Sequence, residues 1–286
     1  MSYFYHVVWK TCKAILDSPE LQMKLPETSE ECKLAASGFR SISYKEAIPN
    51  CVGVLDGYLL KINTPRKREA ENVRSYYSGH YQCNGVNIQA VADHHCRFSY
   101  LAVAAPGSTG DNDAIHQISL ASRIAALPLG YCIIADAAYT ANEHIVSIYS
   151  GNDRLIQKND DFNFYASQCR IRIEMAFGLM QMKWGILRQP QSCSLKNLKY
   201  QVHAIARLHN FVILERLGQA GANTSNNNEA PGTPSFLPSE PQDEEGNPIL
   251  MDGLSQLFPG WSELREEMAR NVETMGLTRP AGNKLN

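Results

Sequence analysis

The chain has 286 residues, 44% of them hydrophobic and 20% charged, and a net charge of −2. That length and composition suit one medium-sized globular domain with additional segments. They argue against a membrane-spanning protein, because no apolar run approaches the roughly 20 residues that cross a bilayer. The first residues hold no apolar stretch followed by a small-residue cleavage site, so we expect no signal peptide.

The eight cysteines are scattered singly along the chain, and no two of them have the Cys-x-x-Cys spacing. In a chain of this length, scattered cysteines are typical of free thiols in a reducing compartment rather than of a disulfide framework. We therefore expect an intracellular protein.

The net charge hides an asymmetry between the two ends of the chain. From Leu217 to the last residue there are ten acidic and four basic side chains, so that this segment carries −6 and the preceding 216 residues carry +4. A mildly basic body with an acidic tail is compatible with a nucleic-acid partner. The excess is equally compatible with an ordinary solvated surface.

The first 48 residues are predicted to be helical. Between Tyr5 and Leu16 the apolar residues recur at three- and four-residue spacing, which is the period of one helix face. A second, shorter helix is expected over residues 29–36, ending near Gly38.

From Asn50 onward the pattern changes to strands followed by helices. Short apolar or alternating runs bounded by turn residues predict the strands, and three- and four-residue spacing predicts the helices. Residues 145–150 are ambiguous. The expected elements are, in order, a strand at 51–62 interrupted by Asp-Gly, strands at 86–95 and 97–105 joined by a tight turn, a turn at 106–110, a helix at 111–127, a strand at 131–139, and helices at 165–187 and 195–214.

Three strands, a helix, a fourth strand and a long helix is the order of elements in a ribonuclease H-like domain. Such a domain is an α/β structure, a mixed sheet flanked by helices. In the long helix, Ile173, Phe177, Met180 and Trp184 fall on one stripe, which predicts the face that packs on the sheet.

Beyond Leu217 the sequence is rich in Gly, Pro, Asn, Ser and acidic residues, a composition typical of disorder. A last amphipathic helix is expected over residues 261–275. We therefore predict three parts: a helical segment at 1–48, a mixed-sheet domain at 49–216, and a disordered acidic linker with a C-terminal helix at 217–286.

Four acidic residues stand where their surroundings do not explain them. Asp56 lies inside an apolar strand, Asp136 ends the fourth strand, and Glu174 interrupts the apolar stretch of the long helix. Asp111 stands at the expected start of a helix. In the predicted topology the first and fourth strands end side by side and the long helix crosses them. The first three acids therefore converge, with Asp111 close by.

Convergent carboxylates are hard oxygen ligands that suit Mg²⁺ or Mn²⁺. Two such ions about 3.5–4 Å apart can activate a water or a DNA 3′-hydroxyl and stabilise the leaving oxygen of a phosphodiester. Each acid also has an ordinary alternative. These alternatives are a helix cap for Asp111, a turn for Asp56-Gly57, a cap of the next element for Asp136, and an ion pair with Arg170 for Glu174.

Five segments of the middle region carry a resemblance as an ordered set. They are GVLDG (53–57), SGHYQCNGVNIQAVADHHCRFSYLAVAAPGSTGDNDAI (78–115), ADAAYTANEHIVSIYSG (135–151), FNFYASQCRIRIEMAFGLMQMKWGIL (162–187) and ARLHNFVI (206–213). With this set the chain from Asn50 to about Glu215 resembles the DDE endonuclease domain of PIF/Harbinger-type transposases and their domesticated relatives. The resemblance implies that residues 49–216 are a catalytic domain that cuts or joins DNA at the ends of a mobile element.

The resemblance also implies a site and its cofactor. A divalent cation, Mg²⁺ or Mn²⁺, would be bound by the acids that match the family's motif, Asp56, Asp111, Asp136 and Glu174. Arg170, one helical turn before Glu174, would touch a substrate phosphate or orient the carboxylate. Lys183 would contact phosphate.

The sequence departs from the family's pattern in two ways. The family's basic residue in the helix after AFG falls near Gln181, where the nearest basic groups are Lys183 and Arg188. Full-length relatives carry a helix-turn-helix-like region before the catalytic core, whereas only about 48 residues precede it here. DNA recognition is therefore expected to be impaired or supplied by a partner, such as the separate Myb-like protein that relatives use.

The same resemblance implies a nuclear location and leaves the oligomeric state open. The alternative function is that of a domesticated or truncated relative that binds DNA or a protein partner without cutting. The missing upstream region and the acidic tail favour this alternative.

Three further groups of residues carry weaker signals. The pair His209-Asn210 is expected to satisfy nearby backbone rather than to react. A basic run fits a phosphate-contacting or nuclear-import strip as well as a solvated loop; it comprises Arg66, Lys67 and Arg68, with Lys61 and Arg74. A set of zinc-ligand types matches no standard finger spacing; it comprises His80, Cys83, His94 and Cys96.

Overall fold

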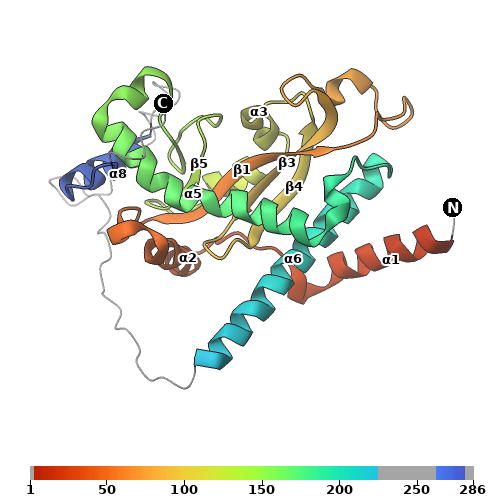
Figure 1. The fold of residues 1–286 in the computed structure, drawn as a ribbon, viewed down its shortest axis with the longest axis horizontal. Coiled ribbons are helices and arrows are strands. Elements are labelled where there is room, and N and C mark those ends of the chain that lie inside the picture. Colours follow the sequence, from red (N-terminus) through yellow and green to blue (C-terminus); the bar gives the residue numbers. More distant parts are fainter. Residues whose placement is uncertain (1–2, 225–261, 281–286) are drawn as a thin grey trace.

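The computed structural model describes residues 3–224 and 262–280 of the chain (Figure 1). The segment predicted to be a disordered linker therefore falls largely outside the described residues, over 225–261.

A six-stranded mixed sheet forms the centre of the molecule. Its order is β2-β3-β1-β5-β6, and β4 also pairs with β3. Strand β3 runs antiparallel to β1 and β4, whereas β5 runs parallel to both β1 and β6. The predicted ribonuclease H-like mixed sheet is confirmed. The strands are β1 (Cys51–Lys61), β2 (Tyr77–Ser78), β3 (Cys83–Ala92), β4 (Phe98–Pro106), β5 (Cys132–Ala135) and β6 (Ile145–Ser147).

Helices cover both faces of this sheet, and α5 crosses over β1 on one of them (Figure 1). The helices are α1 (Tyr3–Asp17), α2 (Ser29–Ile42), α3 (Asp111–His116), α4 (Leu120–Ala125), α5 (Gln157–Lys183), α6 (Leu195–Thr224) and α8 (Glu263–Thr274). Short 3₁₀ helices lie at Pro19–Leu21, Tyr44–Glu46, Val73–Tyr76, Gly151–Leu155 and Gly185–Arg188.

The short strand β5 shows why its sequence is a continuous apolar run. Cys132 and Ile134 pack into the core cluster that also holds side chains of α5, α6 and α8. Ile133 and Ala135 pack into the cluster formed with α2, α3 and α4. A strand buried on both faces has no polar side to alternate with. Each large apolar side chain buried in this way contributes roughly 1.5–3 kcal/mol.

Strand β1 is not interrupted at Asp56-Gly57, so that prediction is wrong. Both residues keep their places in the ladder with β3, Asp56 opposite Ala90 and Gly57 opposite Gln89. The backbone pairing outweighs the low strand propensity of Asp and Gly, because a central strand gains its stability from both neighbours.

The single helix predicted over residues 111–127 is two helices, α3 and α4. Ile115 and Ile124 both belong to the same core cluster. Nine residues of one straight helix turn through about 900°, which would place the two side chains on opposite faces. The break at residues 117–119 brings both of them onto the core.

Helix α5 begins at Gln157, eight residues before its predicted start. Its first two turns hold buried polar side chains that hide the apolar period. Asn163 bonds to the backbone N–H and carbonyl of Tyr149, and Asp161 accepts from the N–H of Arg279. The predicted stripe further along is confirmed, since Ile173, Phe177 and Met180 are buried in the main core.

Helices α2, α6 and α8 also depart from the sequence reading. Helix α2 continues through Gly38 to Ile42, because the missing side chain of Gly38 leaves room for the ring of His94. Helix α6 runs ten residues past Leu214. Helix α8 packs against α5 and buries Met268, so the C-terminal helix is part of the domain's packing.

Among the described helices, none combines the length and the apolar character that crossing a membrane requires.

Candidate active site

The candidate site begins where two parallel strands end together. Leu55 of β1 pairs with Ala135 of β5, and this is the last pair in the register between the two strands. Asp56 and Asp136 are the next residues on each strand. Parallel strands direct their carboxyl ends to the same edge of a sheet, so the two aspartates are neighbours although 80 residues separate them along the chain.

Asp56 is the most buried of the acids with an ion-pair partner at this site, with 20% of its side chain exposed. Its Oδ1 accepts the N–H of Gly57 at 2.8 Å. Burial raises its pKa to about 7, and the nearby carboxylates of Asp136 and Asp111 raise it further, against the lowering effect of the Gly57 N–H and Arg170. Asp56 is therefore poised to gain from any added positive charge.

Asp136 is half-buried at the start of the loop that follows β5. Its Oδ1 accepts the N–H of Ala138 at 2.8 Å, which closes a tight turn on its own loop. The loop is fixed to α3 as well, because the N–H of Thr140 donates to Oδ1 of Asn112 at 2.9 Å.

Asp111 approaches the site from α3, on the other face of the sheet. The helix cap is Gly110, and the Asp111 side chain makes no capping bond. Its Oδ1 instead accepts the amides of Asn87 at 2.8 Å and Gln89 at 2.9 Å. A Cβ at Gly57 would collide with this carboxylate, so the Gly after Asp56 is what lets Asp111 reach β1.

Glu174 lies on α5, with 48% of its side chain exposed. Arg170 joins it to Asp56. One guanidinium nitrogen lies 2.6 Å from Oε1 of Glu174, and the other lies 4.0 Å from Oδ2 of Asp56. The predicted ion pair between Arg170 and Glu174 is therefore present, and it connects the long helix to the end of β1.

The structure thus brings all four predicted acids to one region, although they come from β1, α3, the loop after β5 and α5. Two residues that the sequence reading missed, Asn87 and Gln89, hold Asp111. They carried the same signal as Asp56, a polar side chain inside an apolar strand, in the stretch VNIQAVA.

Two tyrosines also belong to this region. The pKa of the Tyr139 hydroxyl is raised by burial and by the carboxylates of Asp111, Asp56 and Asp136. The same causes, in the same order, raise the pKa of Tyr81, an exposed residue of the β2–β3 turn. Tyr81 is therefore the exposed aromatic side chain that lies within electrostatic reach of all three aspartates.

The residues fit a divalent cation in kind. Asp56, Asp111 and Asp136 each fix Oδ1 by hydrogen bonds from protein N–H groups, and among the described residues Oδ2 of each accepts none. These free oxygens are the hard donors that Mg²⁺ and Mn²⁺ prefer. In the conformation described, however, no three Asp, Glu, His or Cys side chains of residues 3–224 and 262–280 are grouped tightly enough to hold an ion.

The predicted phosphate contact Lys183 is exposed at the last residue of α5. Nine residues separate it from Glu174, so it lies about 13 Å further along the helix and roughly half a turn round. Arg188 caps the same helix end, donating to the carbonyls of Gln181 and Met182 at 3.0 Å. The two basic groups therefore lie apart from the acids.

The other groups singled out in the sequence do not join the site. His80 and Cys83 lie at the opposite end of the ten-residue strand β3 from His94 and Cys96, about 30 Å away by strand rise, so they form no zinc site. The basic run around Lys67 is an exposed turn.

The pair His209-Asn210 satisfies the backbone of the β3–β4 hairpin, as predicted. His209 contacts the carbonyl of Cys96, and Asn210 bonds to both the N–H and the carbonyl of Phe98. The pair does not end α6, which continues to Thr224.

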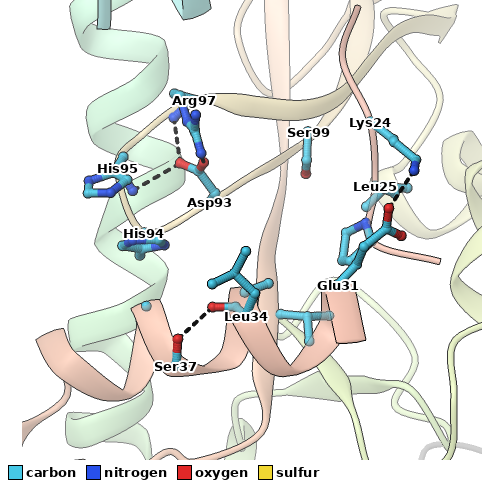
Figure 2. A pocket seen from close by; sticks show the side chains of 14 residues that line it. Lys24, Leu25, Glu31, Leu34, Ser37, Asp93, His94, His95, Arg97 and Ser99 are labelled. Atoms are coloured by element: carbon cyan, nitrogen blue, oxygen red, sulfur yellow. Dashed lines mark hydrogen bonds and ion pairs between the residues drawn. The ribbon is translucent and has the colours of Figure 1, made fainter. Parts of the chain in front are cut away.

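A pocket of about 470 Å³ lies away from the acids, between α2 and the β3–β4 turn (Figure 2). Its charged groups are already paired with one another, Asp93 with Arg97 and Lys24 with Glu31. Nothing in this pocket adds to the four acids, so we place the candidate site at the end of β1 and β5.

Comparisons with known proteins agree with this reading. The search of curated proteins and the search of solved structures each gave no match. The family model described as DDE superfamily endonuclease matches residues 55–210, more than half of the chain. The matched span begins beside Asp56 and includes the other three acids. The chain belongs to the DDE superfamily endonuclease family.

Proposed function

We propose that this protein is a divalent-metal-dependent DNA endonuclease of the transposase type, acting at Asp56, Asp111, Asp136 and Glu174. One observation carries the proposal. Three aspartates from separate segments lie within electrostatic reach of one another, and they share a single nearby cation, Arg170, with Glu174. A group of carboxylates with so little compensation is costly for a fold that uses it only for stability.

Bound Mg²⁺ or Mn²⁺ would supply activation of a water or a 3′-hydroxyl and stabilisation of the leaving oxygen of a phosphodiester. The free Oδ2 atoms of Asp56, Asp136 and Asp111 would bind the cations. Arg170 would orient Glu174, in preference to a direct phosphate contact, because its guanidinium is already engaged by two carboxylates. Tyr81 is placed to meet a DNA strand that enters the site.

The finer assignment to the PIF/Harbinger type is also a proposal, supported by the five ordered sequence segments. With it we propose element-end DNA as the substrate, a separate Myb-like protein as a DNA-recognition partner, a nuclear location, and Lys183 as a phosphate contact remote from the acids.

A second function has an observation in its favour. Within the described residues the acids are not gathered tightly enough to hold an ion, and Glu174 is held by Arg170. A protein that binds DNA or a partner without cutting would keep such an arrangement permanently. A nuclease would have to release Glu174 from Arg170 on binding a cation.

Nicking of supercoiled plasmid in Mn²⁺ separates the two functions. We expect the parent to nick, and Asp136→Asn and Glu174→Gln to lose at least about 10²-fold in rate, the usual cost of removing one group that stabilises developing charge. Glu143→Gln, an exposed acid on the same loop side of β5, is the matched control and should nick like the parent. Equal nicking by all variants, or DNA binding without nicking by the parent, would refute the endonuclease.

A further inference from the structure

Behind Asp111 lies a chain of buried polar side chains that the proposed function does not use. Gln89 is fully buried in β3, Tyr139 is 2% exposed, and Asn87 is 7% exposed. The Tyr139 hydroxyl donates to Oε1 of Gln89 at 2.6 Å. The Gln89 amide donates to Oδ1 of Asp111 at 2.9 Å and to Oδ1 of Asn87 at 2.8 Å.

The direction of every bond in this chain is fixed by chemistry. Asn87 donates to the carbonyl of Thr109 at 3.1 Å, so its amide nitrogen faces that carbonyl and its oxygen faces Gln89. The Tyr139 hydroxyl can only donate to the Gln89 oxygen, so the Gln89 nitrogen must face Asp111. Neither amide can flip without breaking two bonds.

These bonds have two consequences for the acids. Oδ1 of Asp111 receives two amide N–H groups, which leaves Oδ2 as its free oxygen. Gln89 also ties Tyr139, three residues after Asp136, to the strand that supports Asp111. The two loops that carry acids therefore meet at one side chain.

A buried glutamine is an expensive way to fill a strand position. Burying an amide is unfavourable unless all its bonds are made, and an apolar side chain of the same size would be at least as stabilising. Gln89 occurs between Ile88 and Ala90, both fully buried apolar residues. Stability alone gives no reason for a glutamine there, whereas the holding of a carboxylate does.

We propose that Gln89 is a positioning residue. It holds Asp111 with one oxygen engaged and the other free to bind a cation, and through Tyr139 it fixes the loop of Asp136 relative to it. This inference rests on the proposed function for its purpose, but the coupling of Gln89 to Asp111 stands on the contacts alone.

Mn²⁺ binding to the full chain, measured by calorimetry, tests the positioning. We expect Gln89→Leu to weaken Mn²⁺ binding about tenfold, since partners behind a ligand typically govern 10- to 100-fold in metal affinity. Tyr139→Phe, which removes one oxygen and should fold normally, is expected to weaken it about threefold, the effect of one net hydrogen bond.

Gln191→Leu is the matched control. Gln191 is also buried, its amide donates to the carbonyls of Ile186 and Gln189, and its oxygen accepts from Gln201, far from the acids. We expect this variant to lower the thermal midpoint without changing Mn²⁺ affinity. If Gln89→Leu and Tyr139→Phe bind Mn²⁺ as tightly as the parent, the positioning role is overturned.

A second measurement, in EDTA, needs no metal. Urea midpoints are compared for Gln89→Leu, Asp111→Asn and the double variant. We expect the two changes to be non-additive, because the residues share a bond. Additive midpoints would overturn the inference whatever the metal result. A parent that binds no Mn²⁺, with coupled midpoints, would instead refute the proposed function and leave the coupling of Gln89 to Asp111 supported.

Discussion

Aspartates lie at two places in this sheet, and their surroundings differ. At the β3–β4 turn, Asp93 accepts the N–H groups of His95 and Arg97 at 2.9 Å, and its other oxygen pairs with the Arg97 guanidinium at 2.6 Å (Figure 2). At the end of β1 and β5, Asp56, Asp111 and Asp136 repel one another, and the nearest guanidinium is shared with Glu174.

The difference separates an acid that stabilises the fold from acids that the fold tolerates. Asp93 organises its own turn and uses all its capacity to accept bonds. Each of the three clustered aspartates keeps an oxygen without a hydrogen bond from the described residues and raises the free energy of ionising its neighbour. Groups that cost stability in this way are commonly found at functional sites.

The largest expected effect is on the pH dependence of stability. The pKa of Asp56 is raised to about 7 in the folded protein from an ordinary value of 3.8. A raised pKa favours the folded state at pH below the ordinary value, and this contribution is lost as pH rises through 7. In EDTA, the parent should lose stability between pH 4 and 8 relative to Asp56→Asn, by at most about 4 kcal/mol.

Urea unfolding of both proteins at several pH values checks this. Asp153→Asn, which removes an acid from the exposed stretch before α5, is the control and should follow the parent. A parent curve parallel to that of Asp56→Asn across this pH range would show that Asp56 ionises normally and that the contrast with Asp93 is false.

The second effect concerns added cations. Mn²⁺ at 100 times its dissociation constant should stabilise the parent by about 2.7 kcal/mol. For a domain of this size that corresponds to a rise of roughly 5–10 °C in thermal midpoint. The double variant Asp56→Asn/Asp136→Asn should show no rise, because its ligand oxygens and their mutual repulsion are both removed. Equal shifts in the two proteins, followed by differential scanning calorimetry, would place the cation elsewhere.

The smallest effect is expected at the turn. Asp93→Asn removes the partner of a half-buried Arg97 and should cost about 1–2 kcal/mol of unfolding free energy, measured by urea titration. Plasmid nicking should stay at the parent level, because this turn lies away from the acids. A loss of nicking with unchanged stability would invert the comparison and make the turn part of the functional site.

The sequence was informative wherever the signal is local. Apolar runs bounded by turn residues gave the four main strands, and polar residues inside such runs gave Asp56, Asp136 and Glu174. These signals work because a residue's burial depends first on its own strand or helix. The same logic would have found Gln89, had amides been weighed like carboxylates.

The sequence by itself determined the fold class, the order of strands and the identity of the four acids. Only the tertiary structure decided how they are held: the sharing of Arg170, the approach of Asp111 over Gly57, the bond from Tyr139 to Gln89 fifty residues away, and the packing of α8 on α5. The physical reason is distance along the chain. Periodicity records which face of an element is buried, whereas these contacts depend on how separate elements meet.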